Sequence, residues 1–320
     1  MGVNNIIKEI KKNSKFLIAS HVNAEGDALG SELALAALLK KMGKKVCIVN
    51  SEKPSANYGF LPGIKMIRQK VGDFKFDVVF VVDCPVIQRI GALAGLLDKD
   101  KRIVTIDHHM DNKRFGRANW VDPKASSTGE MIYRLFHLMR VNMDKRDALN
   151  IYAAILTDTG SFRHANTTSE VLKIASDLLN FGITPAKVYT RIYENNTRED
   201  MMFVAKVISG MHFIAGGEIA WAEIKKGVCK KIEGKTELID KILDFGKSVD
   251  SVQVVAIFYQ LGDQSTKVSL RSKAPVNVQK VAKVFGGGGH RCASGCRIKS
   301  ELQTVKSNML REIKAELAHY

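Results

Sequence analysis

Short apolar runs alternate with amphipathic stretches over the first 110 residues, and this alternation constrains the fold most. Four runs predict buried strands, at residues 15–22, 44–50, 76–83 and 102–109. Residues 28–43 show helical apolar spacing and end at Gly43, a typical C-terminal helix residue, and residues 86–99 lie between the last two strands. Strands that are apolar on both faces and separated by helices predict a parallel sheet covered on both sides.

The remaining chain predicts a second, different domain. Helices are expected within residues 127–140, 144–162, 168–182 and 184–211, and the polar stretch 194–200 indicates a boundary between domains 1–195 and 196–320. Beyond it, two hairpins are expected at residues 212–226 and 252–273, then a helix at 276–286, a strand and a lysine-rich final helix. The fold class is therefore α/β, with a parallel-sheet domain followed by a smaller α+β domain.

Charge and cysteine content limit the functional classes. The 320 residues carry a formal net charge of +16, which favours polyanionic partners such as nucleotides or RNA, although lysine spread over helix surfaces would give the same value. The five cysteines include no CxxC pair and support neither a disulfide framework nor a structural zinc site. No apolar run approaches the roughly 20 residues of a membrane span, and the polar start predicts a cytoplasmic protein.

Acidic and histidine residues recur where the predicted strands end. They are His21, Glu25 and Asp27 after the first strand, Asp83 at the end of the third, and Asp107, His108 and His109 at the end of the fourth. Parallel strands form sites outside their carboxyl ends, so these residues should face one crevice, and Asp158 after an apolar helical stretch is the natural further contributor.

So many carboxylates in one crevice require cations, because buried unpaired charge is costly. Oxygen and imidazole ligands without thiolate favour Mn²⁺, and the number of ligands favours two metal ions, the usual device for activating water against phosphorus. Each motif alone could be a turn or a helix cap. Their joint occurrence favours the metal site.

The chain resembles the DHH phosphoesterases. HVNAEGDALGS, VVDC, IDHH and LTDTGSF are similar to the four motifs of that family, and KVSLRS with GGGGHRCASGC resembles its DHH-associated C-terminal domain. The resemblance covers nearly the whole chain and is closest to the NrnA-type group of oligoribonucleases and pAp phosphatases. It implies an active site in the cleft between the two domains, short RNA and nucleotide bisphosphates as partners and no membrane association, and a homodimer is compatible with it.

The resemblance also implies roles for single residues. One metal ion would be held by His21, Glu25 and Asp83, and a second by Asp27, Asp83, His108 and Asp158, with Asp83 as the bridge. His109 would lie beside the scissile phosphate, and Asp107 would hydrogen-bond at the strand end. Where the family usually has Pro-Asp-Gly-Asp, this chain has Ala24, Glu25, Gly26 and Asp27, a substitution that keeps the charge but lengthens one ligand.

The glycine-rich segment near the C-terminus predicts a phosphate clamp. Gly287, Gly288 and Gly289 would let backbone N–H groups approach a phosphate, while His290, Arg291 and Arg271 would donate hydrogen bonds to it. A glycine run alone could equally be a hinge.

The function expected from this resemblance is metal-dependent hydrolysis of short oligoribonucleotides to mononucleotides and of 3'-phosphoadenosine 5'-phosphate (pAp) to AMP. Two alternatives stay open. The chain could be a phosphodiesterase for pApA from cyclic-di-AMP breakdown, or an inactive RNA-binding protein if Glu25 disables the site.

Overall fold

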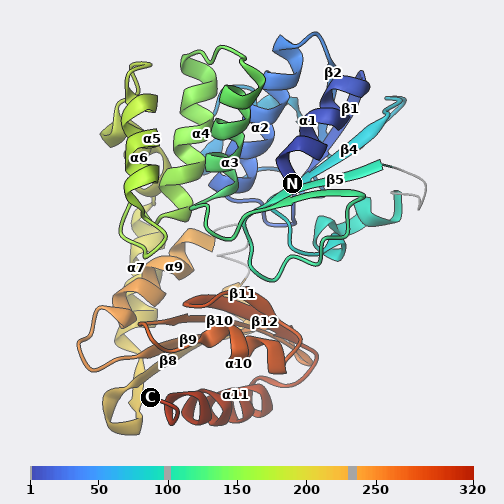
Figure 1. The fold of residues 1–320 in the computed structure, drawn as a ribbon. Coiled ribbons are helices and arrows are strands. Elements are labelled where there is room, and N and C mark those ends of the chain that lie inside the picture. The colour runs from blue at the N-terminus through green and yellow to red at the C-terminus, as the bar shows by residue number, and fades with distance from the viewer. Residues whose placement is uncertain (1, 97–101, 230–235) are drawn as a thin grey trace. The chain divides into compact units, whose positions relative to one another are not determined.

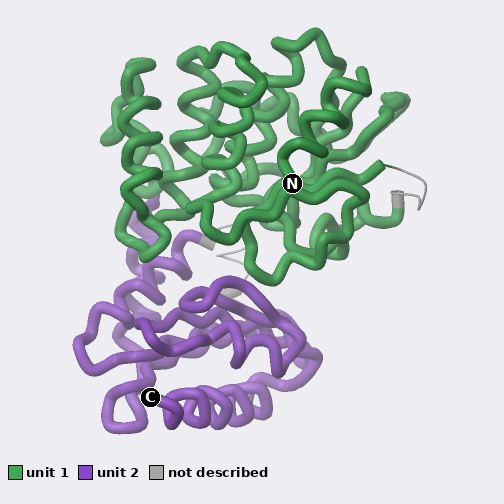
Figure 2. Tube along the Cα trace, in the orientation of Figure 1, with its two compact units in different colours: residues 1–195 green, residues 196–320 purple. Residues whose placement is uncertain are grey.

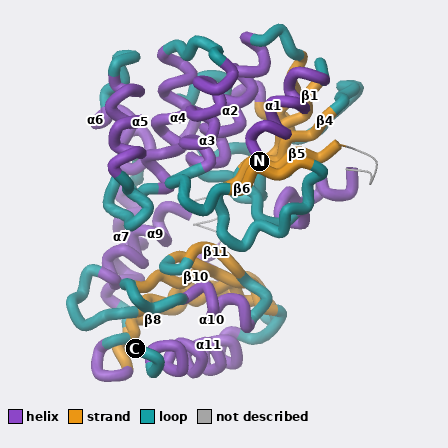
Figure 3. Tube along the Cα trace, in the orientation of Figure 1, coloured by secondary structure: helices purple, strands orange, loops and turns teal. Residues whose placement is uncertain are grey.

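A computed structural model describes residues 2–96, 102–229 and 236–320 of the chain (Figure 1). The chain divides into two compact units, residues 1–195 and 196–320, which are coloured separately in Figure 2. Each unit contains one six-stranded sheet with helices packed against it (Figure 3). The predicted α/β fold class is confirmed.

The sheet of unit 1 is parallel throughout. Its strands, in the spatial order β3-β2-β1-β4-β5-β6, are β1 (Lys15–Ala19), β2 (Lys45–Val49), β3 (Ile67–Arg68), β4 (Val78–Val82), β5 (Arg102–Asp107) and β6 (Ala118–Val121). The chain leaves β1 toward β2 on one side and later continues from β4 toward β6 on the other. The sheet therefore has a topological switch point between β1 and β4, the place where open α/β sheets bind ligands.

Both faces of this sheet are buried, as the apolar strand composition predicts. Phe16, Ile18 and Phe80 point into the core beneath the helices, while Leu17 and Val79 alternate with them and pack on the other side. The helices of unit 1 are α1 (Gly2–Lys12), α2 (Gly26–Lys41), α3 (Thr128–Met139), α4 (Lys145–Asp158), α5 (Ser169–Leu179) and α6 (Pro185–Tyr193), with 3₁₀ turns η1 (Ala56–Tyr58) and η2 (Ile64–Met66).

Glycines set the spacing of α2, α3 and α4, which pack side by side (Figure 1). A Cβ atom on Gly30 of α2 would lie 2.3 Å from the carbonyl oxygen of Asn150 in α4. A Cβ on Gly129 of α3 would lie 2.4 Å from the Cβ of Ala154, also in α4. Real atoms do not approach so closely, so a side chain at either position would push the helices apart.

Two segments of unit 1 differ from the expectation. Helix α1 was not predicted, although it buries Ile6 and Ile10 against the sheet core. Residues 86–99, expected to be helical, form the 3₁₀ segment η3 (Ile87–Leu96), and residues 97–99 lie outside the described part. The helix is interrupted at Gly91, whose φ of 66° belongs to the left-handed region that glycine enters most readily.

Unit 2 contains a mixed sheet with the strand order β11-β12-β10-β9-β8-β7. The predicted hairpins are confirmed as the antiparallel pairs β7–β8 and β9–β10, whereas β8 and β9 run parallel. The elements are α7 (Arg198–Ser209), β7 (His212–Ile214), η4 (Ala215–Gly217), β8 (Ile219–Ile224), α8 (Lys226–Cys229), α9 (Thr236–Lys247), β9 (Val254–Gly262), β10 (Ser265–Ser272), α10 (Val278–Val284), β11 (Gly288–His290), β12 (Ala293–Ile298) and α11 (Leu302–Leu317).

The two faces of this sheet differ in their cover. Helices α10 and α11 pack on one face, where the inward residues of β10 are Val268 and Leu270, and helices α7 and α9 contribute to a core on the other face. None of the helices in the described part of the chain is long and apolar enough to cross a bilayer.

Candidate metal centre

The switch point of unit 1 brings together side chains that follow β1 and β4. Nε2 of His21 lies 3.5 Å from Oδ2 of Asp83, and both residues are buried. Asp83 has a φ of 53°, in the left-handed region that Asp and Asn tolerate better than other non-glycine residues, and its N–H donates to the carbonyl of Ile106 in β5. This backbone turn directs the carboxylate back over the strand ends.

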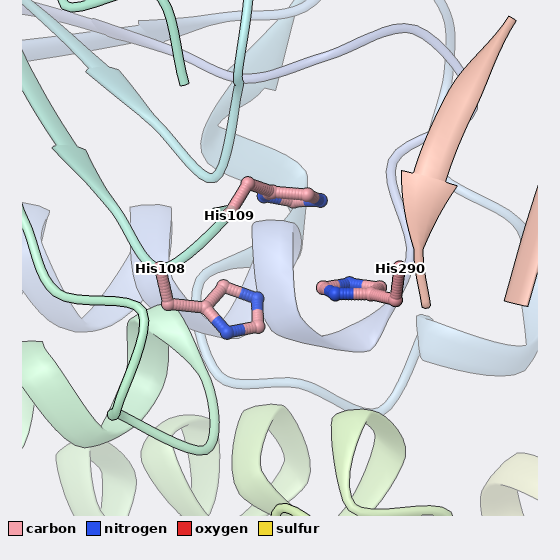
Figure 4. A group of neighbouring side chains, drawn as sticks. All are labelled: His108, His109 and His290. Atoms are coloured by element: carbon pink, nitrogen blue, oxygen red, sulfur yellow. The ribbon is translucent and has the colours of Figure 1, made fainter. Parts of the chain in front are cut away.

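His108 lies at the centre of the cluster. Its Nε2 is 3.7 Å from a carboxylate oxygen of Asp27, 3.7 Å from one of Asp83 and 3.6 Å from one of Asp158. Figure 4 shows its ring beside that of His109, with ring centroids 5.0 Å apart; the third labelled side chain, His290, belongs to unit 2. Three carboxylates predicted to bind metal therefore lie around one nitrogen of a fourth predicted ligand, His108.

Asp27 is oriented by the N-terminus of α3. The backbone N–H groups of Thr128 and Gly129 donate to its two carboxylate oxygens at 2.7 and 2.8 Å, and the Ser31 hydroxyl donates at 3.1 Å. The Thr128 hydroxyl also donates to Asp83. A helix N-terminus carries partial positive charge, so it holds the carboxylate in place while leaving lone pairs for a cation.

Asp158 reaches the cluster from the last residue of α4. The side-chain amide of Asn166 donates to its carboxylate at 3.3 Å and to its backbone carbonyl at 3.2 Å. The same amide donates to the carbonyl of Ser126, just before α3. Asn166 therefore fixes the end of α4 against the start of α3.

His109 points along a separate hydrogen-bonded chain. Its Nδ1 lies 2.7 Å from Oδ1 of the fully buried Asp107 and 3.6 Å from Asp83. The amide of Asn112 donates to the other oxygen of Asp107 and to the backbone carbonyl of Cys84, the residue after Asp83. The arrangement fixes the orientation of the His109 ring relative to Asp83.

Glu25 differs from the other predicted ligands in its exposure. It is the N-cap residue of α2, its side chain is exposed, and it does not belong to any group of possible metal ligands found among the described residues. Its carbonyl accepts the first helical hydrogen bond, from the N–H of Leu29.

Burial and neighbouring charges shift the pKa values of the clustered groups away from their ordinary ranges. Burial, together with the Asp83 charge, raises the pKa of Asp27 well above its usual range. Burial would also raise the pKa of Asp83, but the hydrogen bond from His21 and the nearby histidines lower it further than burial raises it. Burial opposes a charged His108, yet Asp158, Asp27 and Asp83 raise its pKa to about 9. Metal binding requires deprotonated ligands, so a cation that bound here would displace protons from these groups.

The donor set fits a divalent cation. Asp27, Asp83 and His108 each offer one ligand atom, and these atoms lie within 4.8 Å of one another. The set consists of carboxylate oxygen and imidazole nitrogen without thiolate, which suits Mn²⁺ and related ions. The described residues of unit 1 therefore could hold a metal at this point.

In unit 2, strand pairing brings two predicted clamp residues to one face of the sheet. Arg271 of β10 and His290 of β11 both pair with Ala293 of β12, and directly paired residues point to the same side. Nη2 of Arg271 lies 2.5 Å from the carboxylate of Asp240 in α9, and Nη1 donates to the carbonyl of Leu270. Arg291 lies in the turn after β11 and donates to the carbonyl of Pro275.

The predicted clamp glycines have a structural reason as well. A Cβ on Gly287 would lie 2.3 Å from the carbonyl oxygen of Gly295, and one on Gly289, which has a φ of 133°, would lie 2.5 Å from that of Ala293. The hairpin β11–β12 therefore needs glycine at both positions with or without a bound phosphate.

Sequence reasoning missed several residues that shape the centre. They are Ser31, Asn112, Thr128, Gly129 and Asn166. The Ser-Thr-Gly-Glu segment at 127–130 carried a usable signal, since a Ser N-cap followed by Glu marks a helix N-terminus. The asparagines lie in loops where nothing in the sequence distinguishes them from ordinary turn residues.

Comparisons with known proteins show the family of the chain. Residues 15–158 match the N-terminal domain of the DHH family, and residues 223–319 match the DHHA1 domain. A Thermus thermophilus protein named bifunctional oligoribonuclease and PAP phosphatase NrnA is 32% identical over 302 residues, which cover 94% of this chain and 89% of the relative. A Bacillus subtilis protein of the same name is 26% identical, covering 92% of this chain and 93% of the relative.

Solved structures share the fold. An exopolyphosphatase-related protein from Bacteroides fragilis superposes with a TM-score of 0.87 at 25% identity, covering 98% of this chain and 96% of that one. Exonuclease RecJ bound to manganese gives a TM-score of 0.51 at 13% identity, covering 100% of this chain and 95% of that one, which shows the shared fold alone. With both domain matches in the expected order and relatives similar along almost the whole chain, the protein belongs to the DHH family and carries a C-terminal DHHA1 domain.

Proposed function

We propose that the protein is a metal-dependent phosphoesterase that hydrolyses short oligoribonucleotides to mononucleotides and dephosphorylates pAp to AMP in the cytoplasm. The cluster of Asp27, Asp83, His108 and Asp158 carries this proposal, because its chemistry fits divalent metal ions at the switch point. The names of the relatives, which span nearly the whole chain, supply the substrate class.

Two divalent ions, Mn²⁺ by preference, would be held by these residues. Asp27, Asp83, His108 and Asp158 would hold one, and His21, Glu25 and Asp83 the other. The ions would activate water and neutralise charge on the phosphoryl oxygens. The first set is the better supported, because three of its members lie around Nε2 of the fourth, His108, whereas Glu25 of the second set is exposed.

The protein's own groups would orient the substrate. Burial opposes a charged His109, but the hydrogen bond with Asp107 raises the pKa of that ring, so the protonated imidazole would donate to a phosphoryl oxygen. In unit 2, Arg271, His290, Arg291 and the backbone N–H groups of residues 287–289 would bind a phosphate group. Arg271 is held on one side by Asp240, so its guanidinium would meet that phosphate already oriented.

The direct test measures release of phosphate and mononucleotide from pAp, pApA, a short RNA oligomer and pyrophosphate, each with Mn²⁺, Mg²⁺ or EDTA. We expect Mn²⁺-dependent turnover of pAp and of the RNA oligomer, and loss of turnover in EDTA. If no substrate turned over with either metal while RNA still bound, the proposal would be wrong and the chain would be a binding protein.

Arg271→Ala tests the clamp. Removing a charged donor to phosphate should raise KM for pAp by roughly 10- to 100-fold with a smaller change in kcat, since a charge-assisted hydrogen bond contributes about 1.5 to 3 kcal/mol. Arg297→Ala serves as the matched control, because Arg297 lies exposed on β12 and pairs with Lys267, away from His290 in register. An equal effect of both variants would indicate general charge attraction in place of a clamp.

A further inference from the structure

Arg89 lies beside the metal centre although the family motifs do not include it. It belongs to η3, which follows the loop after β4, and its backbone carbonyl accepts the N–H of Val22 at 2.7 Å. Its Nη2 is 3.5 Å from Nδ1 of His21. A cationic side chain is therefore held next to a predicted metal ligand.

The contact with His21 does not satisfy the guanidinium. Nδ1 of His21 lies 2.7 Å from the carbonyl oxygen of Val22, so this nitrogen carries the hydrogen and donates to that carbonyl. Nε2 of the same ring faces Asp83. Arg89 thus meets a nitrogen that is already a donor. Its guanidinium forms no ion pair with a carboxylate of the described residues, which are 2–96, 102–229 and 236–320.

The backbone around Arg89 is built to keep it there. Gly91 has a φ of 66°, and a Cβ at this position would lie 2.7 Å from Oγ of Ser51 and 2.8 Å from Cγ1 of Val22. The Ser51 hydroxyl donates to the carbonyl of Ile90 at 2.7 Å. The backbone of residues 89–91 is therefore fixed against the loop that carries His21. The backbone position of Arg89 does not depend on the contacts of its own side chain.

Charge balance indicates what Arg89 binds. Under the function proposed above, two divalent ions would be neutralised by the carboxylates of Glu25, Asp27, Asp83 and Asp158. The positive charge of Arg89 is additional, and a cation beside metal ions is unfavourable unless an anion lies between them. We propose that Arg89 is a catalytic residue that donates to the non-bridging oxygens of the scissile phosphate. This inference rests on the proposed function and adds a charged donor in unit 1 to it.

Arg89→Gln and Arg89→Lys test the role in the full-length protein at saturating Mn²⁺. We expect kcat/KM for pAp to fall roughly 30- to 300-fold in Arg89→Gln, in line with loss of one charged donor to the transition state, and to recover in part in Arg89→Lys. The control is Arg146→Gln, which removes the same charge from the exposed start of α4, roughly 18 Å along the helix from Asp158. This control should keep the wild-type value.

Arg89 could act on the substrate, or it could only hold His21 in place for the metal ion. Mn²⁺ affinity, measured by calorimetry without substrate, distinguishes these two roles. An unchanged or tighter Mn²⁺ affinity in Arg89→Gln is expected, since a cation near the site is lost. If kcat/KM stayed within twofold of wild type, or if its loss were fully restored by raising Mn²⁺, the inference would be overturned.

Inorganic phosphate gives a readout that does not require turnover. Calorimetric titration of phosphate into the Mn²⁺-loaded protein should show at least about tenfold weaker binding in Arg89→Gln than in wild type and Arg146→Gln. If wild type turned over no substrate but showed this difference, the proposed function would fail while the anion-binding role of Arg89 survived. Equal phosphate affinity in all three proteins would remove that role.

Discussion

Asp83→Asn is expected to lower kcat/KM for pAp by about 10³-fold or more with little change in the fold. The variant keeps the size of the side chain and tolerates the φ of 53°, but it removes the charge that faces His21 at 3.5 Å and His108 at 3.7 Å. Asp83 is the residue that both proposed ligand sets share, so one substitution should weaken both metal sites. Kinetics at several Mn²⁺ concentrations and metal content by mass spectrometry measure the two effects.

Asp77→Asn provides the matched control. Asp77 lies at the other end of the same strand, where its exposed carboxylate accepts the backbone N–H groups of Ser14 and Lys15. A small loss of stability and unchanged kcat/KM are expected for this variant. If Asp83→Asn retained activity within tenfold of wild type, Asp83 would not bridge two metal ions.

The second large effect concerns Glu32, a fully buried carboxyl group on α2. Its Oε2 accepts the side-chain amide of Asn50 at 2.9 Å, and Asn50 in turn accepts the N–H of Ser20, next to His21. Burial raises the pKa of Glu32 from its ordinary 4.5 to about 8. The folded protein therefore keeps this group protonated at neutral pH, whereas the unfolded chain releases the proton above about pH 4.5.

The sign of the pH dependence follows from these protonation states. Between pH 4.5 and 8 the folded state binds more protons at Glu32 than the unfolded state, so the stability contributed by this group falls as pH rises. Glu32→Gln removes the titration and keeps an acceptor for Asn50. We expect the free energy of unfolding of Glu32→Gln, relative to wild type, to rise by about 3 kcal/mol between pH 5.5 and pH 8.

Urea denaturation of both proteins across this pH range measures the difference. Glu170→Gln, a change at an exposed position in the first turn of α5, controls for the loss of a carboxyl group and should give no comparable trend. Parallel stability curves for wild type and Glu32→Gln would show that Glu32 does not hold its proton on folding.

The sequence predicted the parallel sheet because its four central strands are apolar on both faces, a pattern that leaves few other folds. It could not reveal β3 and β6, which are two and four residues long and only partly buried. Helix α1 was overlooked because polar residues dominate its sequence, although Ile6 and Ile10 lie at helical spacing. Gly91 interrupts a segment that was expected to be helical because it lies between two predicted strands.

The candidate ligands could be predicted from the sequence because each lies at or just after the end of a strand or helix. In a parallel sheet the carboxyl ends of the strands lie along the same edge, so such residues come close together. What the sequence could not supply is how each ligand is oriented. Asp27 depends on the backbone N–H groups of residues about a hundred positions later, and no local pattern encodes that contact. The exposure of Glu25 likewise goes with its place as N-cap of α2, where the helix starts directly after it.

The carboxylates around His108 are also synthesised in a fixed order along the chain. Asp27 belongs to α2, Asp83 follows β4 and Asp158 ends α4, whereas the sheet itself is complete at Val121. A ribosome that has released only the sheet presents Asp27, Asp83 and His108 without Asp158 and without the α3 contacts that orient Asp27. Metal binding by the complete cluster of Asp27, Asp83, His108 and Asp158 would therefore wait for α4 during synthesis.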